Sequence, residues 1–139
     1  MKFIDLFAGL GGFHKALSDL GHQCVFASEI NAELKKLYFE NWGIHPFGDI
    51  VEIVKKNISK IPEHDILCAG FPCQPFSQAG KRMGVEDKRG SLFDEIIQIL
   101  QFRKPKFLLL ENVPHLSTHD NKRTMNRMKK KLNSLGYEI

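Results

Sequence analysis

The stretch KFIDLFAGLGGF, residues 2–13, carries the signals from which the start of the fold is predicted. Lys2–Leu6 is a short, mostly apolar run that ends at a glycine-rich turn, which is typical of a buried strand. After the turn, apolar residues recur at the i, i+3, i+4, i+7 spacing of one helix face: Phe13, Ala16, Leu17 and Leu20. Gly21 stands where a glycine would end that helix. The stretch therefore predicts a strand, a tight turn and a helix, in that order.

The same alternation continues along the chain. Three further apolar runs are predicted as strands: Cys24–Ala27, Ile66–Ala69 and Phe107–Leu110. The predicted helices run from the cap residue Asn31 to Gly43, over about Val51–Ile58, from the Ser91/Asp94 capping box onward, and through Met125, Met128, Leu132 and Leu135. Gly136–Ile139 is interpreted as the start of another strand.

Strands that alternate with helices and are almost continuously apolar predict a parallel α/β sheet with helices on both faces. In such sheets, ligands bind beyond the carboxyl ends of the strands. The segments that directly follow the predicted strands are Phe7–Gly12, Glu29, Gly70–Ser77 and Glu111–Val113. We expect these segments to meet at one edge of the sheet and to form the functional site there.

Composition is typical of one globular domain. The chain has 139 residues, of which 42% are hydrophobic. No apolar run approaches the roughly 18–20 residues of a membrane span, and Asp5 interrupts the N-terminal apolar stretch, so a signal peptide is not predicted. The three cysteines, Cys24, Cys68 and Cys73, lack CxxC spacing. This argues against a disulfide framework or a zinc site and for a reducing, cytoplasmic setting.

Charge is distributed unevenly along the chain. Residues 1–102 carry a net charge of −2, whereas residues 103–139 carry +6. Six of the nine basic residues in the second segment lie between Lys122 and Lys131. This cluster is either a solvated helix face or a surface that faces phosphates or a partner, and composition alone does not decide between them.

The glycine-rich turn Phe7–Gly12 suits a ligand, because glycines let the backbone approach closely and the following helix offers free N–H groups. A plain tight turn is the alternative. A G-x-G-x-x-G dinucleotide motif would need glycine at position 14, where His14 stands, so a NAD site is disfavoured. Glu29 stands where a carboxylate accepts hydrogen bonds from ribose hydroxyls, or it is a solvated charge. Asp49, after Gly48, allows the same two interpretations.

Cys73 is the cysteine best suited to act as a nucleophile. It lies between two prolines directly after a predicted buried strand, so a loop holds it rather than a core. Cys24 and Cys68 lie within apolar strands, where buried, inert thiols are expected. Residues 74–90 have no apolar period, and we expect this loop to be the least ordered internal segment of the ligand-free chain.

Glu111 follows the predicted strand Phe107–Leu110. A carboxylate that leaves an apolar strand is often partly desolvated, which raises its pKa and suits it to donate a proton near neutral pH. The alternative is a carboxylate that caps nearby backbone N–H groups. His115 and His119 are four residues apart but lie in a loop-like stretch with no third ligand nearby, so no metal site is predicted.

Four motifs together resemble one family, the cytosine-C5 DNA methyltransferases of the bacterial restriction–modification kind. They are FAGLGGF (7–13), GFPCQPFS (70–77), RGSLF (89–93) and ENV (111–113), in that order. The resemblance runs from Phe3 to the end of the chain. It implies a Rossmann-like S-adenosylmethionine-dependent methyltransferase fold. It also implies that residues 1–139 form a truncated N-terminal part of the catalytic and cofactor-binding domain, without the target-recognition region.

The resemblance also implies roles for individual residues. Cys73 and Glu111 are the implied catalytic residues. The implied S-adenosylmethionine-binding residues are Phe7, Gly9, Leu10, Gly11, Gly12, Glu29, Ile30, Asp49, Ile50, Pro72 and Leu92. Many family members have an aromatic residue at Ile30, so that contact with the adenine is weaker here. Gln74, Ser77 and Arg89 match positions that contact DNA.

The implied reaction is methylation of a cytosine that is flipped out of double-stranded DNA, through a covalent adduct with Cys73. Two alternatives are the tRNA-modifying branch of the family and a non-catalytic half that binds cofactor or a partner. We expect the chain to self-associate or to require a complementary chain. The expected location is the cytoplasm, at the nucleoid when DNA is bound.

Overall fold

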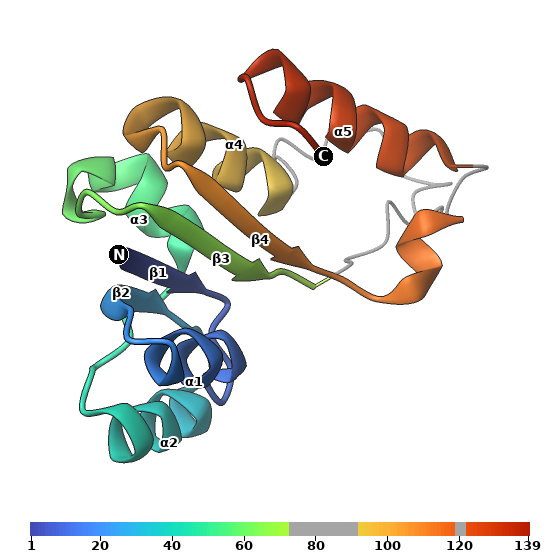
Figure 1. Cartoon of the computed structure of the whole chain (residues 1–139). Helices are drawn as coiled ribbons and strands as arrows, with labels where there is room; N and C mark the ends of the chain where they lie inside the picture. The colour runs from blue at the N-terminus through green and yellow to red at the C-terminus, as the bar shows by residue number, and fades with distance from the viewer. Residues whose placement is uncertain (73–91, 119–121) are drawn as a thin grey trace.

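The fold is built on a four-stranded parallel sheet. A computed structural model describes residues 1–72, 92–118 and 122–139 (Figure 1). The strands are β1 (Lys2–Leu6), β2 (Gln23–Ser28), β3 (Ile66–Gly70) and β4 (Phe107–Glu111), and they lie in the order β2-β1-β3-β4. All neighbouring strands are parallel. The predicted strands are confirmed: β1 has the predicted bounds, and the other three are one or two residues longer than their apolar runs.

Helices connect the strands. They are α1 (Gly12–Asp19), α2 (Ala32–Trp42), α3 (Ile50–Asn57), α4 (Leu92–Arg103) and α5 (Arg123–Ser134), with short 3₁₀ helices η1 (Ile58–Lys60) and η2 (Pro114–Ser117). Asn31 caps α2 as predicted, because its side chain accepts hydrogen bonds from the backbone N–H groups of Glu33 and Leu34. Gly43 ends α2 in the left-handed conformation, with φ of 68°.

Both faces of the sheet are covered, as the strand pattern predicts. On one face, side chains such as Ile4 and Leu67 pack against α3, α4 and α5 in an apolar core. On the other face, Phe3 and Cys68 pack against Leu17 of α1, and α2 contributes the fully buried Tyr38. Figure 1 shows α1 and α2 on one side of the sheet and α3 and α4 on the other. The predicted α/β fold with helices on both faces is confirmed.

The outer strand β4 is covered on one face only. Leu108 and Leu110 pack against the apolar core, but Phe107 is 52% exposed and Leu109 is 41% exposed. Among the described residues β4 pairs only with β3, so its second edge is open. In the described part of the chain, this strand therefore has exposed apolar side chains and one edge without a partner strand.

The predicted strand at Gly136–Ile139 is wrong. After α5 the chain turns, and the Tyr137 N–H donates to the Leu132 carbonyl at 3.2 Å while its hydroxyl donates to the Pro105 carbonyl at 2.7 Å. These bonds hold the segment against α5 and the approach to β4, and it pairs with no strand in the described part of the chain. A strand forms only where a neighbouring strand receives it.

None of the described helices is long and apolar enough to cross a membrane. The loop 74–90, expected to be the least ordered segment, lies outside the described residues.

Candidate functional site

The strand order fixes where a ligand would bind. The chain passes from β1 to β2 on one side and then returns to β3 on the other side of β1. Between β1 and β3 the direction of the connections therefore reverses, and ligands of open α/β sheets bind beyond the carboxyl ends of the strands at such a point. The glycine turn after β1, Glu29 after β2, Phe71 after β3 and Glu111 at the end of β4 all lie at this edge, as expected.

The turn after β1 is unusually contorted. Phe7, Gly9 and Gly11 all have positive φ angles, of 56°, 54° and 87°. Such a conformation is unfavourable for Phe7, which has a Cβ, and it persists because the surroundings over-determine it. The Ala8 N–H donates to the Ser28 carbonyl at 2.9 Å, and the Gly11 N–H donates to the Ala8 carbonyl at 2.8 Å.

The turn leaves room above its backbone. A Cβ added at Gly9 or Gly12 would meet no atom of the described residues within 4 Å. The side chain of Leu10 is 60% exposed and that of Ile30 is 74% exposed. Open backbone beside two exposed apolar side chains is the arrangement that a partly apolar ligand requires.

Glu29 connects the turn to α2. One of its carboxylate oxygens accepts a hydrogen bond from the Gly9 N–H and the other accepts one from the Asn31 N–H, both at 2.9 Å. Each oxygen keeps a further lone pair for another donor. The half-buried carboxylate is therefore fixed in place and still able to accept hydrogen bonds from ligand hydroxyls, which disfavours the interpretation as a freely solvated charge.

Asp49 and Ile50 have local structural roles. The Asp49 side chain accepts a hydrogen bond from the Val51 N–H at 2.8 Å and so caps α3. Ile50 is 3% exposed and belongs to the apolar core, so its side chain is not available to a ligand. At this position a ligand would contact the exposed Asp49 and the backbone. Pro72 is exposed after β3, and Leu92 is half-buried at the start of α4.

The ends of β3 and β4 are tied together by Asn112, a residue whose role the sequence left unassigned. Its side-chain amide donates to the Phe71 carbonyl at 2.8 Å, and its side-chain oxygen accepts from the Val113 N–H. The amide thus fixes the backbone carbonyl two residues before position 73. An Asn directly after an apolar strand was the available signal.

Glu111 is the last residue of β4 rather than the first residue after it, and it pairs with Gly70. Its carboxylate lies over that glycine, since a Cβ on Gly70 would be 3.3 Å from the Glu111 Oε2 atom. The expected partial burial of Glu111 is wrong, because the residue is exposed. It projects from the open strand β4, where no described element covers it.

The prediction of two inert cysteines is confirmed. Cys24 is 8% exposed and Cys68 is fully buried, and both are free thiols. Burial raises the pKa of Cys68 to about 12 and also raises the pKa of Cys24, so neither forms a thiolate near neutral pH. Cys73, Gln74, Ser77 and Arg89 lie outside the described residues.

A buried polar network lies beneath the glycine turn, and the sequence did not predict it. The Tyr38 hydroxyl donates to the Asp5 carboxylate at 3.3 Å and lies 2.7 Å from His14 Nδ1. Because the hydroxyl has a single proton, His14 must donate to it through an Nδ1–H. Burial raises the pKa of Asp5 to about 7, although hydrogen bonds from Tyr38 and the His14 backbone lower it in part. Burial also lowers the pKa of His14.

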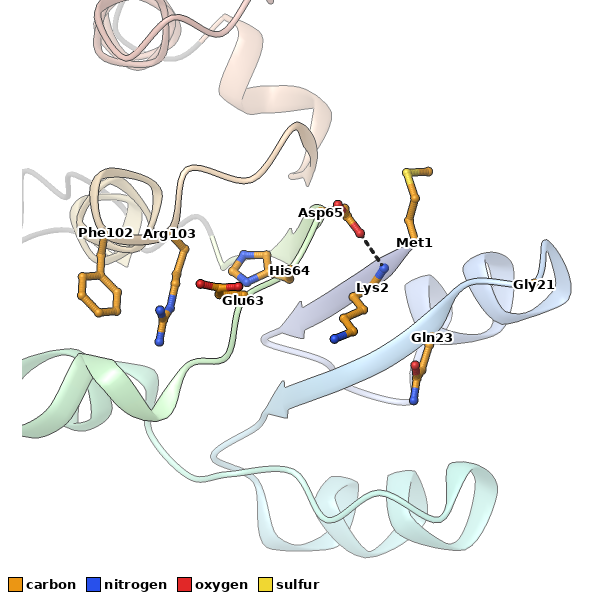
Figure 2. A pocket seen from close by; sticks show the side chains of 9 residues that line it. All are labelled: Met1, Lys2, Gly21, Gln23, Glu63, His64, Asp65, Phe102 and Arg103. Atoms are coloured by element: carbon orange, nitrogen blue, oxygen red, sulfur yellow. Dashed lines mark hydrogen bonds between the residues drawn. The ribbon is translucent and has the colours of Figure 1, made fainter.

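A hollow lies at the opposite, amino edge of the sheet (Figure 2). It is lined by Met1, Lys2, Gly21, Gln23, Glu63, His64, Asp65, Phe102 and Arg103. Its polar groups largely serve the fold, because Asp65 accepts from the Lys2 N–H at 2.9 Å and Arg103 donates to the carbonyls of Ile61 and Ser59. The carboxyl edge is therefore the candidate site.

No group of three or more His, Cys, Asp or Glu side chains that could hold a metal ion is present in residues 1–72, 92–118 and 122–139. The spacing of His115 and His119 is not tested, because the His115 side chain and the whole of His119 lie outside the described part.

Comparison with known proteins agrees with the motifs. The family model for C-5 cytosine-specific DNA methylases matches residues 1–139. Type II methyltransferase M.HhaI of Haemophilus parahaemolyticus is 47% identical over 139 residues, which are 100% of this chain and 42% of the relative. Type II methyltransferase M.HaeII of Haemophilus aegyptius is 51% identical over 138 residues, with 99% of this chain and 42% of the relative covered. The chain thus spans about two fifths of the length of these curated relatives.

Solved structures give the same fold. The Dnmt2 methyltransferase of S. pombe superposes with a TM-score of 0.72 at 24% identity, over 94% of this chain and 41% of that one. A DNMT2 mutant of Spodoptera frugiperda superposes with a TM-score of 0.69 at 27% identity, over 96% and 41%. The sheet and its helices are those of methyltransferases, and the match over all 139 residues shows that the chain belongs to the C-5 cytosine-specific DNA methylase family.

Proposed function

We propose that this chain is the N-terminal, cofactor-binding and catalytic part of an enzyme that methylates cytosine at C5 in double-stranded DNA, with S-adenosylmethionine as methyl donor. The observation that carries the proposal is Glu29. Its carboxylate is held by the Gly9 and Asn31 N–H groups beside the open glycine turn, at the point where ligands of such sheets bind. Family membership supplies the reaction class.

The residues present fit S-adenosylmethionine. Glu29 would accept hydrogen bonds from the ribose hydroxyls, and the open backbone at Gly9 and Gly12 would admit the cofactor closely. The exposed side chains of Leu10 and Ile30 would cover apolar parts of the adenosine. When bound, the cofactor supplies a methyl group made electrophilic by its sulfonium. Phe7 and Gly11 shape the turn. The side chains of Asp49, Pro72 and Leu92 and the backbone of Ile50 would line the rest of the pocket.

Cys73 and Glu111 would act on the base. Cytosine C5 is a weak nucleophile, and addition of the Cys73 thiolate to C6 makes the ring enamine-like. Proton donation by Glu111 at N3 stabilises the charge that develops. After C5 gains the methyl group, loss of the C5 proton expels the thiolate and restores the aromatic ring. Glu111 is exposed in the free chain, so a base lying over it would supply the desolvation that proton donation needs.

DNA would be contacted by Gln74, Ser77 and Arg89, with the target base flipped out of the duplex to reach Cys73. The exposed apolar side chains of β4 would be covered by a complementary chain or by a second copy. A cytoplasmic location, at the nucleoid when DNA is bound, suits this chemistry, because Cys73 must stay a free thiol.

Methyl transfer from labelled S-adenosylmethionine tests the proposal, with duplex DNA and tRNA as acceptors. We expect label at C5 of cytosine in duplex DNA, in a preparation that contains the chain and a family segment that completes it. Transfer to tRNA alone would support the tRNA-modifying alternative. Cofactor binding without transfer to either acceptor would support a non-catalytic half.

A further inference from the structure

The last residue of α2, Trp42, reaches across to the glycine turn. Its indole N–H donates to the Leu10 carbonyl at 3.1 Å. The contact joins residues that are 32 positions apart. Trp42 is the single tryptophan of the chain. The C-terminal end of α2 thus contacts the turn through Trp42. The N-terminal end of α2 is linked to the turn through Glu29, whose carboxylate accepts hydrogen bonds from both the Asn31 N–H and the Gly9 N–H.

The indole is itself held in place. It stacks on the His14 ring, with 4.6 Å between ring centroids and 17° between ring planes. His14 is 6% exposed, and its Nδ1 atom lies 2.7 Å from the hydroxyl of Tyr38, which is fully buried one helical turn before Trp42. Tyr38 donates in turn to Asp5 on β1. The chain of contacts anchors Trp42 to the centre of the sheet.

Trp42 also fills the space behind Gly11. A Cβ at Gly11 would lie 2.3 Å from the indole Nε1 atom, too close for any real side chain. By contrast, a Cβ at Gly9 or Gly12 would meet no atom of the described residues within 4 Å. The turn thus has one side that packs against Trp42 and another that is free to receive a ligand.

We propose that Trp42 is a positioning residue of the cofactor site, whose indole N–H holds the Leu10 carbonyl and thereby fixes residues 9–12 in the conformation that receives S-adenosylmethionine. The inference rests on the proposed function, because it takes this turn to be the cofactor site. It adds a residue that contacts no ligand and acts through the backbone of the turn. Pre-organisation of this kind lowers the ordering cost of binding.

Calorimetric titration of the full chain with S-adenosylmethionine is the first test. Trp42→Phe keeps an aromatic ring against His14 but removes the N–H donor. We expect affinity about fivefold weaker, the effect of losing one ordinary hydrogen bond. The matched control is Phe39→Leu, which removes the other aromatic stack of α2, on His45 at 3.7 Å. We expect the affinity of this control to be unchanged.

Backbone hydrogen exchange of the ligand-free chain gives a readout that a general packing role would not move. We expect faster exchange at residues 9–12 in Trp42→Phe, with exchange in β1 and β3 unchanged. Uniformly faster exchange would assign Trp42 to general stability and overturn the inference.

The binding results separate two failures. If the wild-type chain binds and Trp42→Phe binds equally well, the inference fails while the proposed function stands. If the wild-type chain does not bind S-adenosylmethionine at millimolar concentration, the proposed function fails and the inference fails with it.

Discussion

The two halves of the sheet differ in how completely they are enclosed. The half around β1 and β2 is covered on both faces, by α1 and α2 on one side and by the apolar core on the other. In the half around β4, Phe107 and Leu109 lie exposed and Glu111 projects from an open strand. The proposed cofactor residues Gly9 and Glu29 belong to the first half, whereas the proposed proton donor belongs to the second.

We infer from this difference that the β1 half serves cofactor binding and the β4 half serves catalysis. Under the proposed function, cofactor binding draws on contacts that the described residues make among themselves, such as the Glu29 bridge and the Trp42 contact to Leu10. The proposed proton donor Glu111 lies in the half whose apolar side chains are exposed among the described residues. Perturbations of the β1 half should therefore change cofactor affinity and stability, and perturbations of the β4 half should change methyl transfer or association.

The largest effect is expected from Cys73→Ser. In a complemented preparation that methylates DNA, this change should abolish methyl transfer, because a serine hydroxyl is a far poorer nucleophile at neutral pH than a thiolate. Cys68→Ala is the control, and it should affect stability alone, since Cys68 is buried with a raised pKa. The measurement is incorporation of labelled methyl groups. Turnover retained by Cys73→Ser would show that Cys73 is not the nucleophile.

Asp5 is expected to make the stability of the β1 half depend on pH. Its pKa rises from the ordinary value of 3.8 to about 7 in the folded chain, so the native state holds a proton that the unfolded chain has released. The free energy of unfolding should therefore be highest below about pH 4 and fall as pH rises to about 7, by up to about 4 kcal/mol.

The matched variant for this pH dependence is Asp5→Asn, compared by urea unfolding between pH 4 and pH 8. The comparison is needed because burial raises the pKa of Glu95 and lowers the pKa of His14 and His64. The two histidines act in the opposite direction, because their lowered pKa values make the free energy of unfolding decrease as pH falls through their titration. A wild-type profile that is parallel to that of Asp5→Asn would contradict the prediction.

Gly11→Ala should destabilise the chain by about 2–4 kcal/mol, because it combines a strained left-handed φ with the loss of Trp42 packing. Gly11 has a φ of 87°, and a new Cβ would lie 2.3 Å from Trp42 Nε1. The matched control is Gly21→Ala, where φ is 78° and a Cβ meets no atom of the described residues within 4 Å. The control should cost about 1 kcal/mol, the strain alone. Equal losses in thermal or urea unfolding would show that Trp42 does not pack against the turn.

The smallest effect on the folded chain is expected from Leu109→Lys on the open face of β4. Leu109 is 41% exposed, so stability should change by less than about 0.5 kcal/mol. Self-association should decrease, because the change places a charge in the exposed apolar surface. Light scattering across a concentration series measures self-association. Unchanged association would show that the interface does not include this face of β4.

Much of the fold could be predicted from local patterns. The strand–turn–helix unit at residues 2–21 follows from apolar spacing and glycine placement, and Asn31 and Gly43 bound α2 as their chemistry requires. The strand at Gly136–Ile139 was predicted wrongly because a strand depends on a neighbour that local sequence does not specify. The exposure of Glu111 was missed for the same reason, since it depends on what covers β4.

The candidate site could be predicted in outline but not in its contacts. The carboxyl edge follows from the alternation of strands and helices, and the same pattern predicts that Glu29 and the glycine turn lie there. The network of Asp5, His14 and Tyr38 joins residues from β1, α1 and α2. No sequence period brings those three together. The contact between Trp42 and Leu10 likewise depends on how α2 packs.

The most direct test of the central claim is calorimetric binding of S-adenosylmethionine to the 139-residue chain and to Glu29→Gln. Glu29→Gln removes the negative charge of the carboxylate that accepts hydrogen bonds from the Gly9 and Asn31 N–H groups. This loss should weaken S-adenosylmethionine binding at least tenfold, as expected for hydrogen bonds to a charged group. Glu33→Gln, on the first turn of α2, is the matched control. The account predicts binding by wild type and Glu33→Gln and strongly weakened binding by Glu29→Gln. Equal binding by all three chains would contradict it.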